Sequence, residues 1–361
     1  PIPLTRNQAR CFALIIAIGD IHGCLDPLKA LVDNVLAVWK GRVSRMEFLF
    51  IGDYIDRGPS VKEVLDFLMQ LDAEKTFLMG NHEDMLLHYH LGSDVFEQYG
   101  NAWFASNNGG LQTVAQLDPE SPLPRLVREE TRFSSNSSYK FLKNNGEFNL
   151  SPEYEKFFRS LQFAVQRTLH LEGGPRNVLF SHSVPSPFLP IDKVLECSSF
   201  EDFHALRKEW GVSADGTNLW NRDFLPEPFL GEYTLVHGHT PTFVIPEYIE
   251  RPRFFFSPSD RQSFREPPAS EFVDYDEQQC LAGSIFFSTH KQTHKIVQVD
   301  IDTGAVYGKR LSAILFPENA QESEELSQGE IVSFHLELSS GYSQHGVKQN
   351  QEKPYYVQLA P

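Results

Sequence analysis

The first ninety residues repeat one pattern three times, and this repeat constrains the fold more than any other feature. Each repeat has an apolar run, a polar loop that contains glycine, and a segment with helical periodicity. The apolar runs cover residues 12–18, 47–51 and 76–79. Strands that alternate with helices of this length form parallel β-α-β units. Ligands gather beyond the carboxyl ends of such strands, so the three polar loops are expected to open onto one edge of the sheet.

Two of the intervening helices have recognisable start signals. Asp26 is predicted to be the N-cap of the first helix, with Pro27 in its first turn. Ser60 is predicted to cap the second helix, and Glu63, three residues further on, completes a capping box.

The rest of the chain is expected to complete one domain over residues 11–316. Residues 92–150 have an aromatic stretch and a Ser/Asn-rich segment, which indicate a cap or substrate region. Residues 251–295 lack clear periodicity and are interpreted as an insertion, and residues 317–361 as an acidic C-terminal extension with one strand-like piece. Further elements are predicted as a helix near 152–161 and strands at 163–169, 178–181, 233–236, 296–301 and 310–315.

The charge balance excludes some function classes. The 361 residues have a formal net charge of −16, which argues against a general nucleic-acid or anionic-membrane binder because either surface would repel the protein. A phosphate-binding role would therefore need a concentrated local positive charge. A pair of metal ions is one way to supply it.

The cysteine pattern and the N-terminal residues bear on location. The four cysteines are scattered and include no CxxC pair, which suits a reducing compartment such as the cytoplasm. Arg6 and Arg10 precede the apolar run 11–18, in the manner of a short signal peptide. That run leads directly into the first polar loop, so it is interpreted as a buried first strand.

The predicted sheet edge gathers carboxylate, amide and imidazole groups. Oxygen and imidazole ligands without thiolate suit divalent Mn, Fe or Zn. Each loop alone could be a turn, an ion pair or a helix cap, but three loops in order, with histidines after later strands, predict a metal site. The polar groups are Asp20, His22, Asp53, Asp56, Arg57, Asn81, His82 and Glu83, followed by His182, His237 and His239.

The three loops, GDIHG (19–23), GDYIDRG (52–58) and GNHE (80–83), resemble the signature of the phosphoprotein phosphatases, serine/threonine type, within the calcineurin-like metallophosphoesterases. Segments 219–222, 236–241 and 301–307 are similar to the bacterial-type members. The resemblance implies an α/β fold, a four-layer α/β/β/α sandwich of two mixed sheets flanked by helices. After His182, Ser183 departs from the small Gly or Ala that the family commonly has there.

The resemblance also implies roles for individual residues. His237, two residues before His239, is left open as a ligand or a packing residue. Two divalent ions, with Mn preferred over Fe or Zn, would be held by six side chains: Asp20 and His22 at the first site, Asp53 as the bridge, and Asn81, His182 and His239 at the second.

The implied reaction is direct attack on phosphorus by a hydroxide bridging the metals, since coordination lowers the pKa of water to about 7. Arg57 and Arg222 would bind the equatorial oxygens bidentately. His82, steered by Asp56, would protonate the leaving group as general acid. No cysteine begins a C-x5-R phosphate loop.

The expected substrate is a phosphoprotein or phosphopeptide, cleaved at phospho-Ser or phospho-Thr, with phospho-Tyr left open and no nucleic-acid or membrane partner. Three alternatives remain open: a diadenosine tetraphosphatase-like dinucleotide polyphosphate hydrolase, a phosphodiesterase, and a pseudophosphatase that binds phosphoproteins without cleaving them. The sequence leaves the oligomeric state undetermined.

Overall fold

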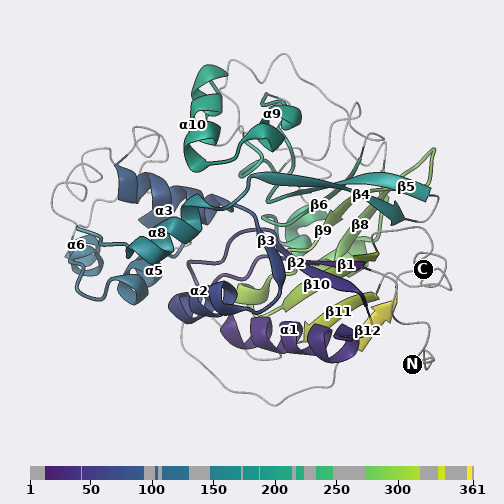
Figure 1. Cartoon of the computed structure of the whole chain (residues 1–361), viewed down its shortest axis with the longest axis horizontal. Helices are drawn as coiled ribbons and strands as arrows, with labels where there is room; N and C mark the ends of the chain where they lie inside the picture. Colours follow the sequence, from purple (N-terminus) through teal and green to yellow (C-terminus); the bar gives the residue numbers. More distant parts are fainter. Residues whose placement is uncertain are drawn as a thin grey trace.

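Two β-sheets pack face to face between layers of helices (Figure 1). The structure is a computed structural model, and it describes residues 13–41, 43–92, 102–104, 108–129, 147–171, 174–186, 188–213, 217–222, 233–246, 273–317, 332–337 and 356–359. Nothing in these segments is a helix long and apolar enough to cross a membrane.

The first sheet contains the three strands of the N-terminal repeat. Its strand order is β12-β11-β10-β1-β2-β3; β1, β2 and β3 run parallel, and the other neighbouring pairs are antiparallel. The signal-like apolar run is the central strand β1, paired on both sides as predicted for a buried strand. The strands are β1 (Ala13–Ile18), β2 (Arg45–Phe50), β3 (Glu74–Phe77), β10 (Arg310–Pro317), β11 (Val332–Glu337) and β12 (Tyr356–Leu359).

The second sheet has the order β4-β5-β6-β9-β8-β7. Strands β5, β6 and β9 run parallel, and antiparallel pairs flank them. Both sheets are therefore mixed. The strands are β4 (Ala164–Leu171), β5 (Gly174–Ser181), β6 (Thr234–His237), β7 (Val273–Tyr275), β8 (Phe286–His290) and β9 (Ile296–Asp300).

Strand β1 shows how the first sheet is buried on both faces. Side chains alternate along a strand, so Ile15 and Ala17 join the core between the sheets, whereas Ile16 and Ile18 pack in the core on the helix side. Burial on both faces explains why the N-terminal runs are continuously apolar. The second sheet contributes Phe180 to the core between the sheets. The four-layer sandwich of two mixed sheets is confirmed.

The helices lie on the outside of the sheets and at one end. In Figure 1, α1 and α2 lie beside the first sheet, α9 and α10 beside the second, and α3, α5, α6 and α8 form a group at one side. The helices are α1 (Leu25–Trp39), α2 (Val61–Gln70), α3 (Asn81–Leu91), α5 (Gly110–Leu117), α6 (Leu123–Glu129), α8 (Pro152–Arg159), α9 (Ile191–Glu196), α10 (Phe200–Glu209), α12 (Glu277–Leu281), and the 3-10 turns η1 (Ala102–Phe104), η4 (Thr242–Val244) and η7 (Ala305–Tyr307).

The predicted helix caps differ from the observed ones. Helix α1 begins at Leu25 with Cys24 as its N-cap, so Asp26 lies inside the first turn and its assignment as N-cap was wrong. Ser60 does precede α2, but its side chain makes no capping hydrogen bond. The amide of Val61 donates instead to Oε1 of Gln116 at 2.6 Å, so a side chain from α5 caps this helix.

Three segments without strong periodicity contain regular structure. Strand β8 pairs with β9, so part of the expected insertion at 251–295 belongs to the second sheet; residues 251–272 lie outside the described residues. In the C-terminal extension, where one strand-like piece was predicted, β11 pairs with β10 and β12 pairs with β11, so two strands extend the first sheet. Region 92–150 holds η1, α5 and α6, and its Ser/Asn-rich part lies mostly outside the described residues. Among the cysteines, Cys24 and Cys280 are buried. Cys11 lies outside the described residues.

Candidate metal centre and its catalytic neighbours

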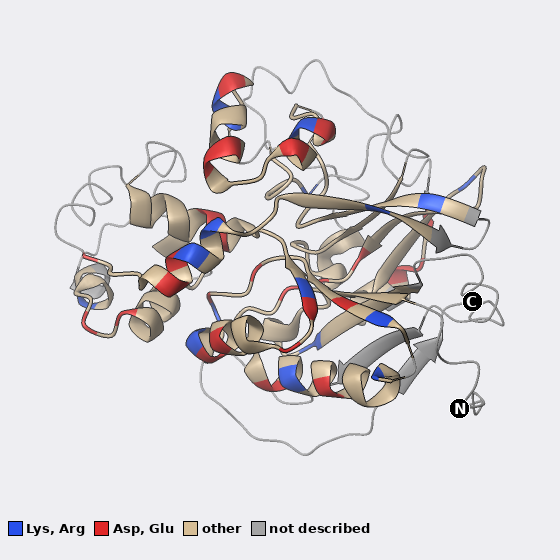
Figure 2. Ribbon diagram, viewed as in Figure 1, with Lys and Arg blue, Asp and Glu red and all other residues tan. Residues whose placement is uncertain are grey.

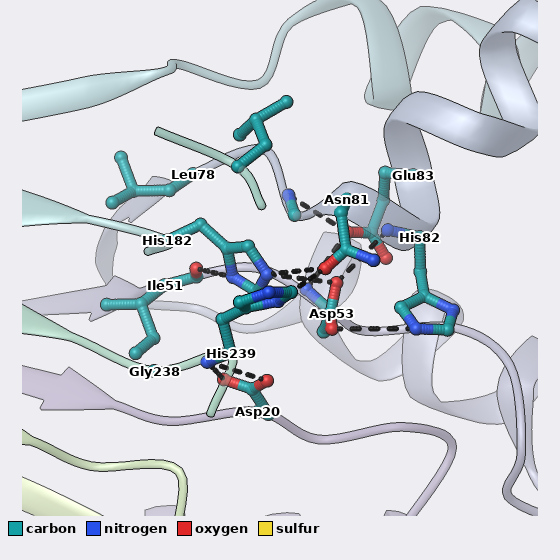
Figure 3. A network of polar contacts seen from close by, with 12 residues as sticks. Asp20, Ile51, Asp53, Leu78, Asn81, His82, Glu83, His182, Gly238 and His239 are labelled. Atoms are coloured by element: carbon teal, nitrogen blue, oxygen red, sulfur yellow. Dashed lines mark hydrogen bonds and ion pairs between the residues drawn. The ribbon is translucent and has the colours of Figure 1, made fainter. Parts of the chain in front are cut away.

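The structure brings the predicted polar loops together at one rim. Loops that follow β1, β2 and β3 meet loops that follow β5 and β6 of the second sheet, and their side chains converge (Figure 3). All six predicted metal ligands are buried, with at most 4% of each exposed. The shared edge predicted from the strand–loop–helix repeat therefore exists.

Asp53, Asn81, His182 and His239 form the tightest part of the rim. Nδ1 of His182 donates to the carbonyl of Ile51 at 2.9 Å, so its Nε2 carries a lone pair. That lone pair faces Oδ1 of Asn81 at 2.9 Å and Oδ1 of Asp53 at 3.4 Å. Nδ1 of His239 lies 2.8 Å from the same Asn81 oxygen. Several acceptor atoms thus converge, an arrangement that a cation between them would stabilise.

His22 lies on the other side of Asp53. Its Nδ1 donates to the carbonyl of Ile55 at 2.8 Å, and its Nε2 lies 3.3 Å from Oδ2 of Asp53. Nη1 of Arg57 lies 2.5 Å from that Nε2 and donates to it. His82 lies nearby, with its Nε2 3.8 Å from Oδ2 of Asp53. His22, Asp53 and His82 could together hold a cation, as could Asp53, His182 and His239.

Asp20 lies below these groups. Both of its carboxylate oxygens accept from the backbone amide of His239, at 3.2 and 3.1 Å (Figure 3). A Cβ on Gly238 would lie 2.1 Å from Oδ1 of Asp20, so only glycine permits this approach. Burial raises the pKa of Asp20 well above its usual value, with help from the nearby charges of Asp302 and Asp53. Asp20 reaches the rim but joins neither three-residue group.

The donor set fits a pair of divalent cations. It contains imidazole nitrogens and carboxylate and amide oxygens without thiolate, as Mn, Fe and Zn accept. A hydrogen bond with the Trp220 backbone leaves Nδ1 of His239, which lies 2.8 Å from Oδ1 of Asn81, as the ring nitrogen available to a cation. Burial lowers the pKa of His22 to about 3 and also lowers those of His182 and His239, which keeps these imidazoles neutral and able to coordinate.

The backbone at the rim is strained. Non-glycine residues with positive φ are uncommon, and each costs about 1–3 kcal/mol when the surrounding structure imposes it. Five rim residues have this conformation: His22 (44°), Asp53 (54°), Asp56 (69°), Arg57 (63°) and His239 (68°).

Glu83 fixes the second polar loop onto the start of α3. Its buried carboxylate accepts from the amides of Asp53 at 2.9 Å and Tyr54 at 2.8 Å, and from those of Ile55 and Gly80 at 3.2 and 3.1 Å. These bonds hold Asp53 against Asn81 and His82. The sequence placed Glu83 at the rim without a role, and its only signal was its place in the GNHE loop.

His82 and Asp56 form the predicted acid pair. Nδ1 of His82 lies 2.6 Å from Oδ2 of Asp56. The same carboxylate accepts from Trp103 Nε1 at 2.9 Å and from Thr113 Oγ1 at 2.5 Å. Sequence reasoning missed both supporting residues.

The protonation of this pair follows from its burial. Burial lowers the pKa of His82 well below its usual value, and it raises the pKa of Asp56 well above its own. A neutral imidazole beside a protonated carboxyl holds as many protons as an imidazolium beside a carboxylate. The predicted acid role of His82 needs one transferable proton, and either arrangement of the pair would supply it.

The positions of Arg222 and His237 bear on the roles predicted for them. Nη1 of Arg222 donates to the carbonyl of His239 at 3.2 Å, so the second predicted phosphate-binding arginine lies at the rim. His237 belongs to neither three-residue group; its Nδ1 contacts the carbonyl of Gly238 at 2.9 Å and its Nε2 contacts the Gln298 amide at 2.7 Å. These contacts favour a packing role, the alternative that the sequence left open.

Two known proteins are similar to the chain in sequence. The chain is 23% identical over 312 residues to the bis(5'-nucleosyl)-tetraphosphatase PrpE [asymmetrical] of Halalkalibacterium halodurans, a match that covers 83% of this chain and 89% of the relative. A protein of the same name from Oceanobacillus iheyensis is 34% identical over 89 residues, 23% of this chain and 36% of the relative.

Two solved structures are also similar. A cold-active protein-tyrosine phosphatase of a psychrophilic Shewanella species matches with 17% identity and a TM-score of 0.40, over 90% of this chain and 78% of that one. A metallophosphoesterase from Sphaerobacter thermophilus matches with 12% identity and a TM-score of 0.31, over 88% and 94%. Likeness at this level carries no argument about function. The family model "Calcineurin-like phosphoesterase" matches residues 13–283, and the chain therefore belongs to the calcineurin-like phosphoesterases.

Proposed function

We propose that this phosphoesterase is a two-metal hydrolase that cleaves dinucleoside polyphosphates. The observation that carries the two-metal part is the position of the Asp53 carboxylate. Its Oδ2 lies 3.3 Å from Nε2 of His22, and its Oδ1 lies 3.4 Å from Nε2 of His182. A carboxylate with each oxygen facing a different imidazole is suited to bridge two cations.

The ligand assignment for the two sites follows the sequence prediction. Bound divalent ions would lower the pKa of coordinated water to about 7 and polarise phosphoryl oxygens. The residues proposed to hold them are Asp20 and His22 at one site, Asp53 between the sites, and Asn81, His182 and His239 at the other.

The chain's own residues would bind the phosphoryl group and manage the proton. In-line displacement spreads negative charge over the equatorial oxygens, which Arg57 and Arg222 are suited to bind through paired N–H donors. Arg57 donates to Nε2 of His22 in this structure and would exchange that acceptor for a phosphoryl oxygen. His82 would pass its proton to the leaving group while Asp56, itself held by Trp103 and Thr113, fixes the ring.

The match to the Halalkalibacterium halodurans relative supports the substrate class, because it runs over 83% of this chain and 89% of the relative. It favours the dinucleotide alternative over the phosphoprotein substrate expected from the loops. A polyphosphate is strongly anionic, and the chain as a whole has a net charge of −16. The site itself must therefore supply positive charge. Acidic and basic residues lie side by side on outer helices such as α8 and α10 (Figure 2).

A phosphoprotein phosphatase is the second candidate. The segment 219–222 resembles the bacterial-type phosphatases, and its Arg222 reaches the carbonyl of His239 at 3.2 Å. This contact favours a phosphoryl-binding role but does not discriminate between a monoester and an anhydride.

The deciding experiment is phosphate and nucleotide release by the Mn-reconstituted protein. Diadenosine tetraphosphate is compared with peptides that contain phospho-Ser, phospho-Thr or phospho-Tyr, and Asp53→Asn is the inactive control. Cleavage of the dinucleotide at a kcat/KM at least tenfold above that of any peptide is expected. Turnover of the peptides with the dinucleotide inert would overturn the substrate class in favour of the second candidate.

A further inference from the structure

An aromatic pair lies beside the predicted phosphate-binding Arg57. The ring of Tyr307 lies 5.8 Å from the Arg57 guanidinium carbon, and Phe243 packs edge-on against Tyr307 with centroids 5.8 Å apart. Nζ of Lys309 lies 5.8 Å from the Phe243 ring. These four side chains, Arg57, Tyr307, Phe243 and Lys309, are called the Tyr307 strip below. Along the strip, a cationic side chain lies at each end and the two aromatic rings lie between them.

The strip lies close to the metal centre. Partial burial raises the pKa of Tyr307, and the charges of Arg57, Asp302, Arg222 and Asp20 also act on it. Groups from both sides of the rim are thus within electrostatic range of this side chain. Tyr307 is nevertheless 45% exposed, so part of its ring remains open to a ligand.

Backbone hydrogen bonds hold the two rings in place. The amides of Tyr307 and Lys309 donate to the carbonyl of Gly304 at 3.0 and 3.1 Å, and the amide of Gly304 donates to Oδ1 of Asp302 at 3.1 Å. The amide of Thr242 donates to the carbonyl of Asp302 at 2.8 Å, which ties η4 and its Phe243 to the same turn. A pre-formed platform loses little conformational entropy when it binds.

A close contact at Gly304 also fixes the positions of Phe243 and Lys309. Gly304 has a φ of 79°, and a Cβ there would lie 2.8 Å from a ring carbon of Phe243. The turn can therefore bring Phe243 and Lys309 this close only with glycine at position 304.

A single exposed aromatic residue usually needs no explanation. Among the described residues, other large exposed apolar side chains include Leu91, Phe188, Trp210 and Leu281. Tyr307 differs because its ring meets a predicted phosphate-binding arginine and lies within range of the rim carboxylates. Phosphate contacts beside an open aromatic face are what a nucleotide requires, since every base has a π-face that can stack.

We propose that the Tyr307 strip is the nucleobase subsite of this enzyme: a base stacks on Tyr307 while its phosphate meets Arg57. This inference rests on the proposed dinucleotide function, because it assigns the part of that substrate next to the cleaved phosphate. Lys309, at the far end of the strip, would add a positive charge for a further phosphate group.

The test compares two ligands that differ only in the base. Adenosine 5'-monophosphate and ribose 5-phosphate are titrated calorimetrically into the Mn-loaded full chain, with His82→Asn in every protein to slow turnover. Stacking of one base contributes roughly five- to a hundredfold in affinity, and we expect the base to improve binding about tenfold. Tyr307→Leu is expected to abolish that ratio, and Tyr307→Phe, which keeps the ring, to preserve it.

The outcomes separate the subsite from the substrate class. Equal binding of the two ligands, or a ratio that survives Tyr307→Leu, would overturn the subsite. A preference for phosphotyrosine over phosphoserine that depends on Tyr307, without any gain in affinity from the base, would also overturn the subsite. The ratio is measured without turnover, so a base preference in these proteins, together with an unaltered chain that leaves diadenosine tetraphosphate intact, would overturn the proposed substrate alone. Matching thermal unfolding of the variants establishes that each is folded.

Discussion

Asp53 contacts more of the proposed centre than any other side chain described above. Its two oxygens face His22 and His182, and its Oδ1 also accepts from the amide of His82 at 3.2 Å. Asp53→Asn removes the charge and one acceptor while it keeps the size. We expect turnover to be lost and both metal ions to be retained poorly, measured by kcat and by metal content after desalting.

The matched control is Asp33→Asn, which makes the same change at an exposed position on α1. It is expected to leave both quantities unchanged. Near-normal turnover in Asp53→Asn, or loss of only one metal equivalent, would argue against a bridging role.

His82 gives a prediction about leaving groups. An alkoxide needs a proton to depart, whereas an aryl oxide needs it much less. His82→Asn should therefore reduce kcat/KM for alkyl phosphoesters by about 10²–10⁴-fold and for aryl phosphates by clearly less. The measurement is the ratio of the two rates in each protein. Equal losses on both substrates would exclude His82 as the acid.

The sequence predicted the residues of the rim better than the residues that support them. Asp53 lies in the loop after β2 and His82 in the first turn of α3, and both positions follow from strand order alone. Trp103 and Thr113, which hold Asp56, are 47 and 57 residues further along the chain. Their contacts depend on how η1 and α5 pack, and neither short element has a periodic signal that fixes this packing.

At the scale of elements, Glu83 joins the loop after β2 to the start of α3. Its fully buried carboxylate accepts hydrogen bonds from the backbone amides of Asp53, Tyr54 and Ile55. Glu83→Gln turns an NH₂ group toward these N–H donors. We expect a loss of about 2–4 kcal/mol in the free energy of unfolding, measured by urea denaturation.

Glu63→Gln is the control, because Glu63 is exposed in the first turn of α2. It should change stability by less than about 0.5 kcal/mol. A Glu83→Gln protein as stable as this control would show that the loop is held by other contacts.

Strands β1 and β2 of the N-terminal repeat were predictable because their apolar side chains are buried on both faces. Strands β7 and β8 were missed: β7 is short and at the sheet edge, and β8 alternates buried and partly exposed positions. The start of α1 was misplaced because Asp26 has the side chain of an N-cap, whereas the backbone turns at Cys24. Local propensity identified these elements but did not fix their ends.

At the scale of the whole molecule, the two-sheet sandwich was predicted only from the resemblance to the metallophosphoesterase family. The parallel start followed from the repeat, but nothing in the later sequence specified that β5, β6 and β9 would run parallel in a second sheet. That pairing joins residues about sixty apart in sequence, as in Val236 with Val299. Pairing at such separations has no local signature.

Metal removal should affect the stability of the whole fold. The proposed ligands come from both sheets, so an ion that binds only the folded chain stabilises their packing by mass action. Saturation at a hundred times the dissociation constant adds about 3 kcal/mol per ion. We expect chelation to lower the melting temperature and abolish turnover, and added Mn to restore both, measured by calorimetry. A melting temperature that does not change on chelation would contradict this, and one that rises with Mn as much in Asp53→Asn as in the unaltered chain would argue against Asp53 as the bridge.

The left-handed backbone at the rim has an evolutionary consequence. His22, Asp53, Asp56, Arg57 and His239 each occupy a conformation that glycine or asparagine would adopt more readily. A library of variants selected only for solubility and thermal stability should therefore accumulate Gly and Asn at these positions. The selected variants should be more stable and catalytically inactive. A second selection for turnover should return the original side chains, because adaptation for robustness and adaptation for chemistry pull these five positions in opposite directions.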